Sequence, residues 1–340
     1  MEALNITVIG GGGIVAREFL KILDERHVAV GRLRLLATAR SAGRVIEFRG
    51  KPITIEETTL SSLSRDDHVV FLSASGAASK LYAPIARDNG SFVVDDSSAY
   101  RMDPEVPLVI PEINPEDLEW HRGIVSQPNC TTTPMAIALH PIHRVNPLKR
   151  IIVSTYQAVA GAGAAAVEGL ASEARAALEG RHEPSGTQKR EIAFNAVPQI
   201  DLFAEDGYTK EEIKMANETR KLLHAPGIAI SATCVRIPAF FGHSMNVWAE
   251  FERPISAAEA RQLMASAPGL TLVDDPAAEQ YPTPLDAAGN DLVLAGRLRA
   301  DSSLPGAITF WTVTDSIRKG AATNVVQIIE EAARRNLIRR

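Results

Sequence analysis

The 340-residue sequence contains little cysteine, few aromatic residues and no long apolar run, and each shortage excludes a class of protein. Two cysteines, Cys130 and Cys234, cannot build a disulfide framework, so we expect a reducing, cytoplasmic setting. Aromatic residues at 5% and a formal net charge of −5 provide neither the stacking platform nor the basic surface of a nucleic-acid-binding protein. No apolar run approaches the roughly 20 residues that span a bilayer, so no membrane partner is expected.

The sequence also lacks the histidine and cysteine spacing of a metal site. Its eight histidines include no pair of the His-Glu-x-x-His type, and its two cysteines lie far apart. We therefore expect no bound metal and do not favour a metal-dependent hydrolase. A targeting segment is not expected either, because the chain enters a strand-like segment at Leu4 without a basic leader.

What the first half does contain is the pattern of an α/β domain. Short, almost wholly apolar runs alternate with amphipathic stretches, which is typical of a parallel sheet whose two faces are covered by helices. The expected strands are residues 6–9, 33–37, 69–72, 92–94 and 124–125. This pattern predicts a Rossmann-like dinucleotide-binding domain.

The pattern changes at about Lys149, where longer runs rich in β-branched residues begin. They predict an α+β domain with a mixed or antiparallel sheet and helices on one side. The expected strands are 151–153, 228–237, 245–251, 292–298 and 308–313, and the expected helices are 164–178, 209–223 and one starting at Ser256, with Glu259 at capping-box spacing. An amphipathic segment, 323–337, is expected to return to the first domain. The predicted domains are therefore 1–129 with 321–340, and 130–320.

A glycine-rich turn follows the first predicted strand. Glycines at residues 10–13 let the backbone turn tightly and approach a pyrophosphate, which would then lie at the positive end of the next helix. The strand–turn–helix context supports a dinucleotide site, whereas a flexible glycine turn is the alternative. The expected cofactor contacts in this loop are Gly10, Gly12, Gly13, Ile14 and Val15.

The end of the second predicted strand bears on cofactor choice. NAD sites usually place an acidic residue there to hold the ribose hydroxyls. This strand instead continues into Thr38-Ala39-Arg40-Ser41, without a carboxylate. Arg40 can pair with a 2′-phosphate, and Thr38 and Ser41 can add hydrogen bonds, so we predict NADP as the cofactor.

The two cysteines stand in different surroundings. Cys234 lies inside an apolar run and is expected to be a buried, inert side chain. Cys130 stands at a predicted strand-to-helix junction, where the positive end of a helix favours a thiolate. A capping loop that happens to contain cysteine is the alternative for Cys130.

Four charged or titratable residues of the second half are candidates for a ligand site. Arg236 leaves a core strand and needs an anionic partner, and its planar guanidinium suits a carboxylate. His243, seven residues later, is either a general acid–base group or a satisfied core histidine. Glu211 and Lys214 stand at i and i+3 of one predicted helix, where a solvated ion pair is the plain interpretation.

Together these motifs resemble the aspartate-semialdehyde dehydrogenase family. The resemblance runs over nearly the whole chain, and several segments in the same order are more specific than any one of them. The segments are residues 41–43, 95–102, 107–114, 128–132, 156–163, 197–201, 211–218, 235–243 and 318–327.

The resemblance implies the catalytic roles. Cys130 would be the nucleophile that attacks the substrate carbonyl, Gln157 would orient the intermediate, and His243 would be the acid–base group. Asn324 would lie near the nicotinamide. We expect further cofactor contacts from Ser73 and Gly161.

The resemblance also implies the substrate contacts. Arg236 would bind the α-carboxylate and Glu211 the ammonium group, while the phosphate site would be formed by Arg101, Asn129 and Lys214. The charges of these residues complement the carboxylate, ammonium and phosphate groups of an amino acid that carries a β-acyl phosphate. At least a dimer through the second domain is implied, so we expect a homodimer or homotetramer.

Some positions depart from the family pattern. The family usually has Asn where this chain has Asp96 and Gln127, and often Ser at Ala160, while the third glycine of the cofactor loop is Ala16. None of these departures falls on the expected nucleophile Cys130, the acid–base group His243 or the substrate-binding Arg236. Asp96 matters most, since an added carboxylate near the cofactor would alter its binding.

The expected reaction is the NADPH-dependent reductive dephosphorylation of L-4-aspartyl phosphate to L-aspartate 4-semialdehyde through a thioester. It belongs to lysine, threonine and methionine biosynthesis. One alternative is a reductase of N-acetyl-γ-glutamyl phosphate. The acetylated amine of that substrate is uncharged, so Glu211 would have no ammonium group to bind. The other is a catalytically silent paralogue, which would be expected to lose some of the residues that this chain keeps.

Overall fold

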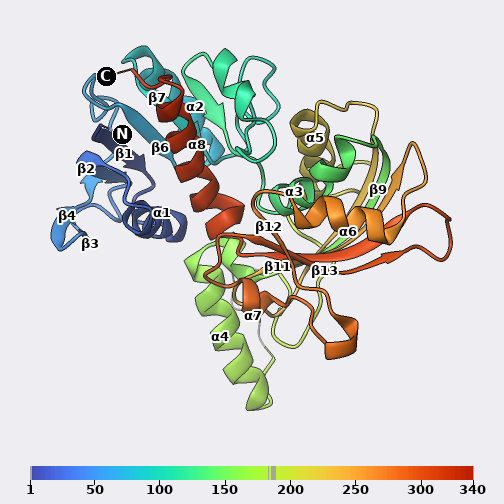
Figure 1. Ribbon diagram of the computed structural model, residues 1–340. Helices are drawn as coiled ribbons and strands as arrows, with labels where there is room; N and C mark the ends of the chain where they lie inside the picture. Colours follow the sequence, from blue (N-terminus) through green and yellow to red (C-terminus); the bar gives the residue numbers. More distant parts are fainter. Residues whose placement is uncertain (1, 183, 185–188, 340) are drawn as a thin grey trace. The chain divides into compact units, whose positions relative to one another are not determined.

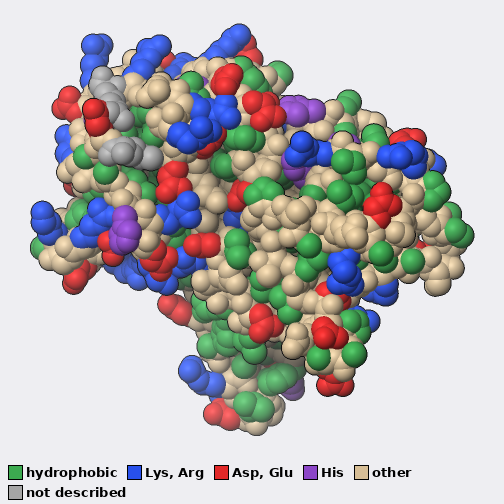
Figure 2. Space-filling model, viewed as in Figure 1, with side chains coloured by type: hydrophobic (Ala, Val, Ile, Leu, Met, Phe, Trp, Pro, Cys, Tyr) green, Lys and Arg blue, Asp and Glu red, His purple; other side chains and the backbone are tan. Residues whose placement is uncertain are grey.

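The computed structural model describes residues 2–182, 184 and 189–339, which form two compact units (Figure 1). The first unit contains residues 1–129 and 321–340, and the second contains residues 130–320. In the described part of the chain, no helix is long and apolar enough to cross a membrane. Figure 2 shows basic and acidic side chains interspersed over the face in view.

The first unit is built on a six-stranded parallel sheet of the predicted kind. The strand order is β5-β2-β1-β6-β7-β8, and every pairing is parallel. The strands are β1 (Leu4–Ile9), β2 (Val30–Ala37), β5 (Glu56–Glu57), β6 (Val69–Leu72), β7 (Phe92–Asp95) and β8 (Ile124–Ser126). Every residue of β6, β7 and β8 is buried, which explains why these strands are continuous apolar runs. The Rossmann-like prediction is confirmed.

Helices of the first unit pack on this sheet. They are α1 (Ile14–Glu25), α2 (Gly76–Asp88), the 3₁₀ helix η1 (Pro115–Trp120) and α8 (Thr323–Arg334). The apolar side of α8 joins the same core cluster as α1 and the sheet. Within this cluster the rings of Phe19 and Phe71 lie 4.7 Å apart between centroids.

A hairpin in the first unit was not predicted. Strands β3 (Val45–Phe48) and β4 (Lys51–Thr54) pair through a tight turn in which Arg49 and Gly50 both have positive φ, 51° and 73°. Both strands are largely exposed, so they lack the continuous apolar signal of the sheet strands.

The second unit has a six-stranded mixed sheet of order β10-β9-β11-β14-β13-β12. Its strands are β9 (Leu148–Gln157), β10 (Ala229–Arg236), β11 (His243–Phe251), β12 (Leu270–Leu272), β13 (Val293–Ala300) and β14 (Ile308–Thr314). The two outer pairings, β10 with β9 and β12 with β13, are parallel, and the inner ones are antiparallel. The predicted mixed sheet is confirmed, and only the short β12 was missed.

Helices of the second unit pack against this sheet. Helix α3 (Thr132–His143) contacts β11, β13 and β14, α5 (Lys210–Leu222) contacts β10, and α6 (Ala257–Ala265) contacts β12 and β13. The remaining elements are η2 (Val159–Ala162), α4 (Ala164–Leu178), η3 (Pro276–Ala278), α7 (Pro284–Ala287) and the π-helical η4 (Arg318–Ala322). Ser256 caps α6 by accepting from Glu259 N–H at 3.1 Å, and a complete capping box joins Thr209 and Glu212 at α5.

Strand register decides which side chains of the sheet share a face. Arg236 pairs with Gln157, Tyr156 pairs with Ser244, and His243 pairs with Thr314. Since Cβ atoms alternate along a strand, Arg236, Gln157 and His243 form one row across three neighbouring strands and point to the same face. All three are buried.

Candidate functional site

The glycine loop of the first unit has the close backbone approach that the sequence predicts. Gly10 has φ of 89°, and a Cβ there would lie 2.0 Å from the carbonyl oxygen of Ser73, so no other residue fits. Gly13 is the N-cap of α1 and offers no side-chain cap to the first turn of that helix. Unpaired backbone N–H groups of such a first turn suit a phosphate, and the exposed Gly13 leaves room for one.

The turn after β2 lies against this loop. Ser41 N–H donates to the Thr38 carbonyl at 2.8 Å, and a Cβ placed at Gly12 would lie 3.4 Å from the Cβ and Oγ atoms of Ser41. Arg40 is exposed, and no acidic side chain of the described residues lies within ion-pair distance of it. The turn thus brings a cationic side chain and two hydroxyls to the edge of the glycine loop.

Arg101 and Asn129, predicted for the phosphate site, are buried in the first unit. Arg101 Nη2 donates to the backbone oxygen of Asp96 at 2.7 Å. The side chain of Asp96 accepts a hydrogen bond from Gln127 Nε2, so two of the departures from the family pattern are in direct contact. Burial raises the pKa of Asp96 to about 6, although Arg101 and Gln127 oppose that shift.

Cys130 lies in the second unit, directly before Thr131, the N-cap of α3. The sulfur-bearing residue therefore meets the positive end of a 12-residue helix, as its sequence position predicts. A Cβ placed at Gly320 would lie 3.0 Å from Cys130 Cβ, so the backbone of residue 320 forms a wall beside the cysteine.

Ala158 holds two of the candidate side chains through its backbone. Its N–H donates to His243 Nδ1 at 3.1 Å, and its carbonyl oxygen accepts from Arg236 Nη1 at 2.6 Å. Gln157, the preceding residue, accepts from Thr155 Oγ1 at 2.8 Å and donates from Nε2 to Glu211 Oε1 at 3.2 Å. The C-terminal end of β9 thus holds the imidazole of His243, the guanidinium of Arg236 and the side-chain amide of Gln157 in place.

His243 is a neutral hydrogen-bond donor in this arrangement. Because Nδ1 accepts the Ala158 N–H, the proton of the neutral ring is assigned to Nε2. Burial and, second, the nearby charge of Arg236 lower the pKa of His243 to about 3. Nε2 has no hydrogen-bond partner among the described residues and faces Gly161, where a Cβ would lie 3.0 Å away.

Arg236 is a buried cation whose hydrogen-bonding capacity is only partly used. Its Nε atom has no partner among the described residues, and no carboxylate of those residues forms an ion pair with it. Burial lowers its pKa, while Cys130 and Glu211 oppose that shift, which places both groups within electrostatic range of the guanidinium. A buried guanidinium of this kind suits an anionic ligand.

Glu211 and Lys214 form the i, i+3 pair on α5, and Asp201 joins them. Lys214 Nζ lies 2.8 Å from Asp201 Oδ2 and 3.3 Å from Glu211 Oε2. The ammonium group is therefore held between two carboxylates, and the plain ion-pair interpretation accounts for these contacts. The buried Glu211 also accepts from Gln157, which ties the pair to the row of site residues.

Cys234 is buried, as its apolar surroundings predict. It is fully buried, and its Sγ packs against Met215 Sδ at 3.6 Å. Burial raises the pKa of the Cys234 thiol far above its usual range.

The predicted residues thus fall into two groups, one in each unit. The second unit brings together Cys130, Gln157, Gly161, Glu211, Lys214, Arg236 and His243, whereas the first unit holds Gly10, Gly12, Gly13, Ile14, Val15, Thr38, Arg40, Ser41, Ser73, Arg101, Asn129 and Asn324. Ala158 and Gly320, which contribute backbone atoms to the site, were not predicted. A residue whose side chain does no chemistry gives no signal of its own in the sequence.

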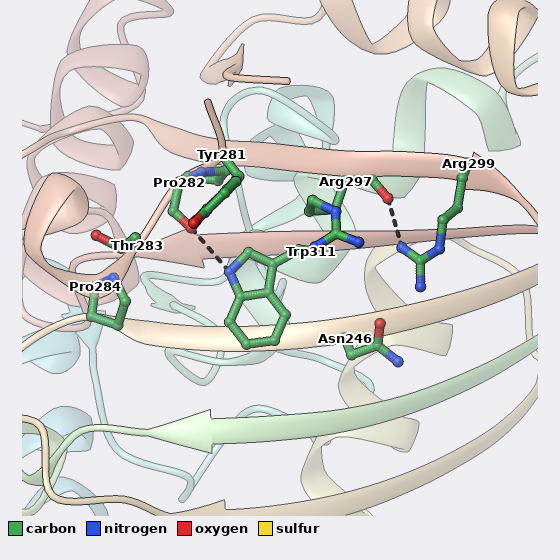
Figure 3. A pocket seen from close by; sticks show the side chains of 8 residues that line it. All are labelled: Asn246, Tyr281, Pro282, Thr283, Pro284, Arg297, Arg299 and Trp311. Carbon is green, nitrogen blue, oxygen red and sulfur yellow. Dashed lines mark hydrogen bonds between the residues drawn. The ribbon is translucent and has the colours of Figure 1, made fainter. Parts of the chain in front are cut away.

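A separate cavity lies on the opposite face of the second sheet (Figure 3). It has a volume of about 330 Å³. Its lining residues are Asn246, Tyr281, Pro282, Thr283, Pro284, Arg297, Arg299 and Trp311. Asn246 and Trp311 pair across β11 and β14 and point away from the face that carries His243, so this cavity is not the candidate site.

Comparison with known proteins agrees with this division of the chain. Residues 5–121 match the family model of the semialdehyde dehydrogenase NAD binding domain, and residues 139–319 match that of the semialdehyde dehydrogenase dimerisation domain.

Full-length relatives have the same description. The chain is 47% identical to aspartate-semialdehyde dehydrogenase of Aquifex aeolicus over 98% of this chain and 99% of that protein, and 43% identical to that of Bacillus subtilis over 99% of each. The crystal structure of aspartate semialdehyde dehydrogenase II from Vibrio cholerae complexed with ASA superposes with a TM-score of 0.94 at 39% identity, covering 98% of this chain and 99% of that one. This chain therefore belongs to the aspartate-semialdehyde dehydrogenase family.

Proposed function

We propose that this chain catalyses the NADP-dependent interconversion of L-4-aspartyl phosphate and L-aspartate 4-semialdehyde, in the cytoplasm, as a step toward lysine, threonine and methionine. The observation that carries the proposal is the buried row of Arg236, Gln157 and His243, two of whose members are held by the backbone of Ala158. The name of the Vibrio cholerae enzyme and its complex with ASA support the choice of substrate.

The residues of the first unit fit a dinucleotide with a 2′-phosphate. Any Cβ at Gly10 would collide with Ser73, so this turn requires glycine. A glycine turn between a strand and a helix is the usual setting for a pyrophosphate. Arg40, with Thr38 and Ser41, would hold the 2′-phosphate. When bound, the cofactor supplies or accepts the hydride, and Asn324, Gly161 and the remaining loop residues would position it.

The sulfur of Cys130 performs the covalent step. In the biosynthetic direction the thiolate attacks the acyl carbon of aspartyl phosphate, a C–S bond forms, and the C–O bond to phosphate breaks so that phosphate leaves with the electron pair. Reduction of the thioester gives a tetrahedral hemithioacetal on Cys130. Its C–S bond then breaks, the electron pair returns to sulfur, and the aldehyde is released.

His243 acts as a donor in this scheme. The neutral ring offers Nε2–H to the oxygen on which negative charge develops at the tetrahedral stage. Gln157 would orient the same intermediate. Since His243 is held by a backbone N–H rather than by a carboxylate, it is preorganised without a second charged group.

The charged residues account for substrate selection. Arg236 would bind the α-carboxylate with the guanidinium atoms that the fold leaves available, and Glu211 would bind the ammonium group. Lys214, Arg101 and Asn129 would hold the phosphate. An N-acetylated substrate has no ammonium group, which disfavours the N-acetyl-γ-glutamyl phosphate alternative.

The exposed face of the second sheet supports a homodimer, or a homotetramer built from it. Ile152 is 48% exposed and Tyr156 is 37% exposed on this face, and the ring of Tyr156 lies beside that of Trp311 with centroids 5.3 Å apart. Apolar side chains at the centre of a sheet face suit contact with a second copy.

A phosphate-dependent assay tests the proposal. Purified protein is incubated with L-aspartate 4-semialdehyde, inorganic phosphate and NADP, and formation of NADPH is followed by absorbance. We expect turnover that requires phosphate and falls to background with N-acetylglutamate semialdehyde. Turnover that is equal on both aldehydes, or independent of phosphate, would refute the assigned substrate.

A further inference from the structure

The row of site residues on the second sheet continues onto a fourth strand. The row contains Arg236 on β10, Gln157 on β9 and His243 on β11. In the register of β11 with β14, His243 pairs with Thr314, the last residue of β14. Side chains of directly paired residues lie on the same face of a sheet, so Thr314 points to the face that carries His243. The side chain of Thr314 is fully buried there.

The end of β14 also lies close to Cys130. The backbone N–H of Gly320 donates to the carbonyl oxygen of Asp315, the residue after Thr314, at 3.0 Å. A Cβ placed at Gly320 would lie 3.3 Å from this oxygen and 3.0 Å from Cys130 Cβ, so both groups approach the same point. The backbone next to Thr314 is therefore close to the proposed nucleophile, while the neighbouring strand carries His243.

The carboxylate of Asp315 anchors this strand end. Its Oδ1 accepts from the backbone N–H groups of Ile317 at 2.8 Å and Arg318 at 3.1 Å, and its Oδ2 accepts from that of Gly289 at 2.8 Å. Hydrogen bonds to an ionised acceptor are among the strong ones in proteins. Thr314 therefore presents its side chain from a backbone that is held on the next residue by three such bonds.

The Thr314 hydroxyl is buried and has no hydrogen-bond partner among the described residues. Thr312, two residues earlier on the same strand and face, differs in this respect, because its Oγ1 donates to the carbonyl oxygen of Leu294 at 3.1 Å. Arg236 Nε and His243 Nε2, in the same row as Thr314, also lack partners among those residues. Buried polar atoms normally find a partner, so three such atoms in one row favour a common ligand.

We propose that Thr314 is a further substrate-contacting residue, whose hydroxyl donates a hydrogen bond to the oxygen on the reacting carbon while that carbon is bonded to Cys130. This inference rests on the proposed function, which makes Cys130 the nucleophile. A neutral hydroxyl, like the neutral ring of His243, stabilises the negative charge that develops on this oxygen without adding a charge to the free site.

Valine and serine at position 314 separate the hydroxyl from the rest of the side chain. Thr314→Val replaces the hydroxyl by a methyl group of similar size, whereas Thr314→Ser keeps the hydroxyl and loses the methyl group. Thr312→Val is the matched control, because it removes a buried hydroxyl whose partner is the Leu294 carbonyl. For each full-length variant, kcat and KM are measured with L-aspartate 4-semialdehyde, phosphate and NADP, and the Tm is measured by thermal scan.

We expect Thr314→Val to lower kcat about 10- to 100-fold, with KM for NADP unchanged and a Tm no lower than that of the wild type, since the hydroxyl has no protein partner to lose. Thr314→Ser should stay within about threefold of the wild-type kcat. Thr312→Val should instead lower the Tm and keep kcat, because it breaks a structural hydrogen bond. If Thr314→Val does not fold, Thr314→Ala compared with Thr314→Ser isolates the same hydroxyl.

A Thr314→Val variant with the kcat of the wild type would overturn the inference, and a lowered Tm in that variant would then assign the hydroxyl to a buried water. Equal losses of kcat in Thr314→Val and Thr314→Ser would also overturn it, because the packing of the side chain rather than its hydroxyl would then matter. A wild-type protein that does not turn over L-aspartate 4-semialdehyde would instead refute the proposed function itself.

Discussion

The backbone N–H of Ala158 donates a hydrogen bond to Nδ1 of His243 at 3.1 Å. This contact fixes the neutral ring as an Nε2–H donor, and the buried guanidinium of Arg236, bonded to the carbonyl of the same Ala158, disfavours a second proton on the ring. The site is therefore organised around a strand end, with a neutral imidazole beside a permanent cation.

The low pKa of His243 predicts how stability changes with pH. The ring titrates at 6.5 when unfolded and at about 3 when folded, so between these values the unfolded chain binds the extra proton. The stability that His243 contributes is complete above pH 6.5 and is lost as the pH falls toward 3. We expect His243→Asn to lose less of its Tm between pH 6.5 and 4.5 than the wild type, with exposed His182→Asn as the control. Equal losses in thermal scans would contradict the assigned pKa.

Arg236→Lys keeps the positive charge but removes the planar, bidentate guanidinium. We expect kcat/KM for L-aspartate 4-semialdehyde to fall about 10- to 100-fold, with cofactor affinity preserved, because a lysine cannot pair with both carboxylate oxygens in one plane. Steady-state kinetics check this, with Arg150→Lys, at an exposed arginine of β9, as the matched control. Unchanged kinetics in Arg236→Lys would remove this residue from the substrate site.

Gly161→Ala places a methyl group 3.0 Å from Nε2 of His243. Since the ring is held on its other side by Ala158, it cannot turn away freely, and we expect kcat to fall about tenfold or more while the Tm changes little. Gly227→Ala, where nothing lies within 4 Å of the new carbon, is the control. A Gly161→Ala enzyme with full kcat would show that Nε2 does not face the reacting groups.

Arg40→Ala tests the choice between the two nicotinamide cofactors. Loss of the cation should raise KM for NADP about tenfold or more and leave KM for NAD nearly unchanged, because only NADP carries the 2′-phosphate. Arg44→Ala, a few residues away and also exposed, is the control. If the ratio of the two KM values stays as in the wild type, the assignment of Arg40 is wrong.

Helices and strands whose apolar residues recur at regular spacing could be predicted from the sequence. Most strands of both sheets and the helices α1, α4, α5 and α8 were predicted from the spacing of their apolar residues, whereas the short strands β5 and β12 were not. Cys234 was distinguished from Cys130 by its apolar neighbours alone. The hairpin of β3 and β4 was missed because its strands are exposed and short. The roles proposed for Gln157 and Glu211 came from the family resemblance, since the spacing of Glu211 and Lys214 by itself favoured a plain ion pair.

What sequence could not reveal is how side chains are held. Ala158 bonds both His243 and Arg236 through backbone atoms that every residue type possesses. Asp96 and Gln127 are 31 positions apart, and only the parallel pairing of β7 with β8 brings their segments together. Contacts of this kind depend on strand register, which a single sequence does not fix.

Single turnover of Cys130→Ala, in parallel with Cys234→Ala, tests the covalent role of Cys130 most directly. Each variant is mixed with NADP, phosphate and L-aspartate 4-semialdehyde, and NADPH formation and NADP binding are both measured. We predict that Cys130→Ala binds NADP normally and forms no NADPH, because no thioester can form, whereas Cys234→Ala remains active. NADPH formation by Cys130→Ala at a rate near that of the wild type would contradict the account.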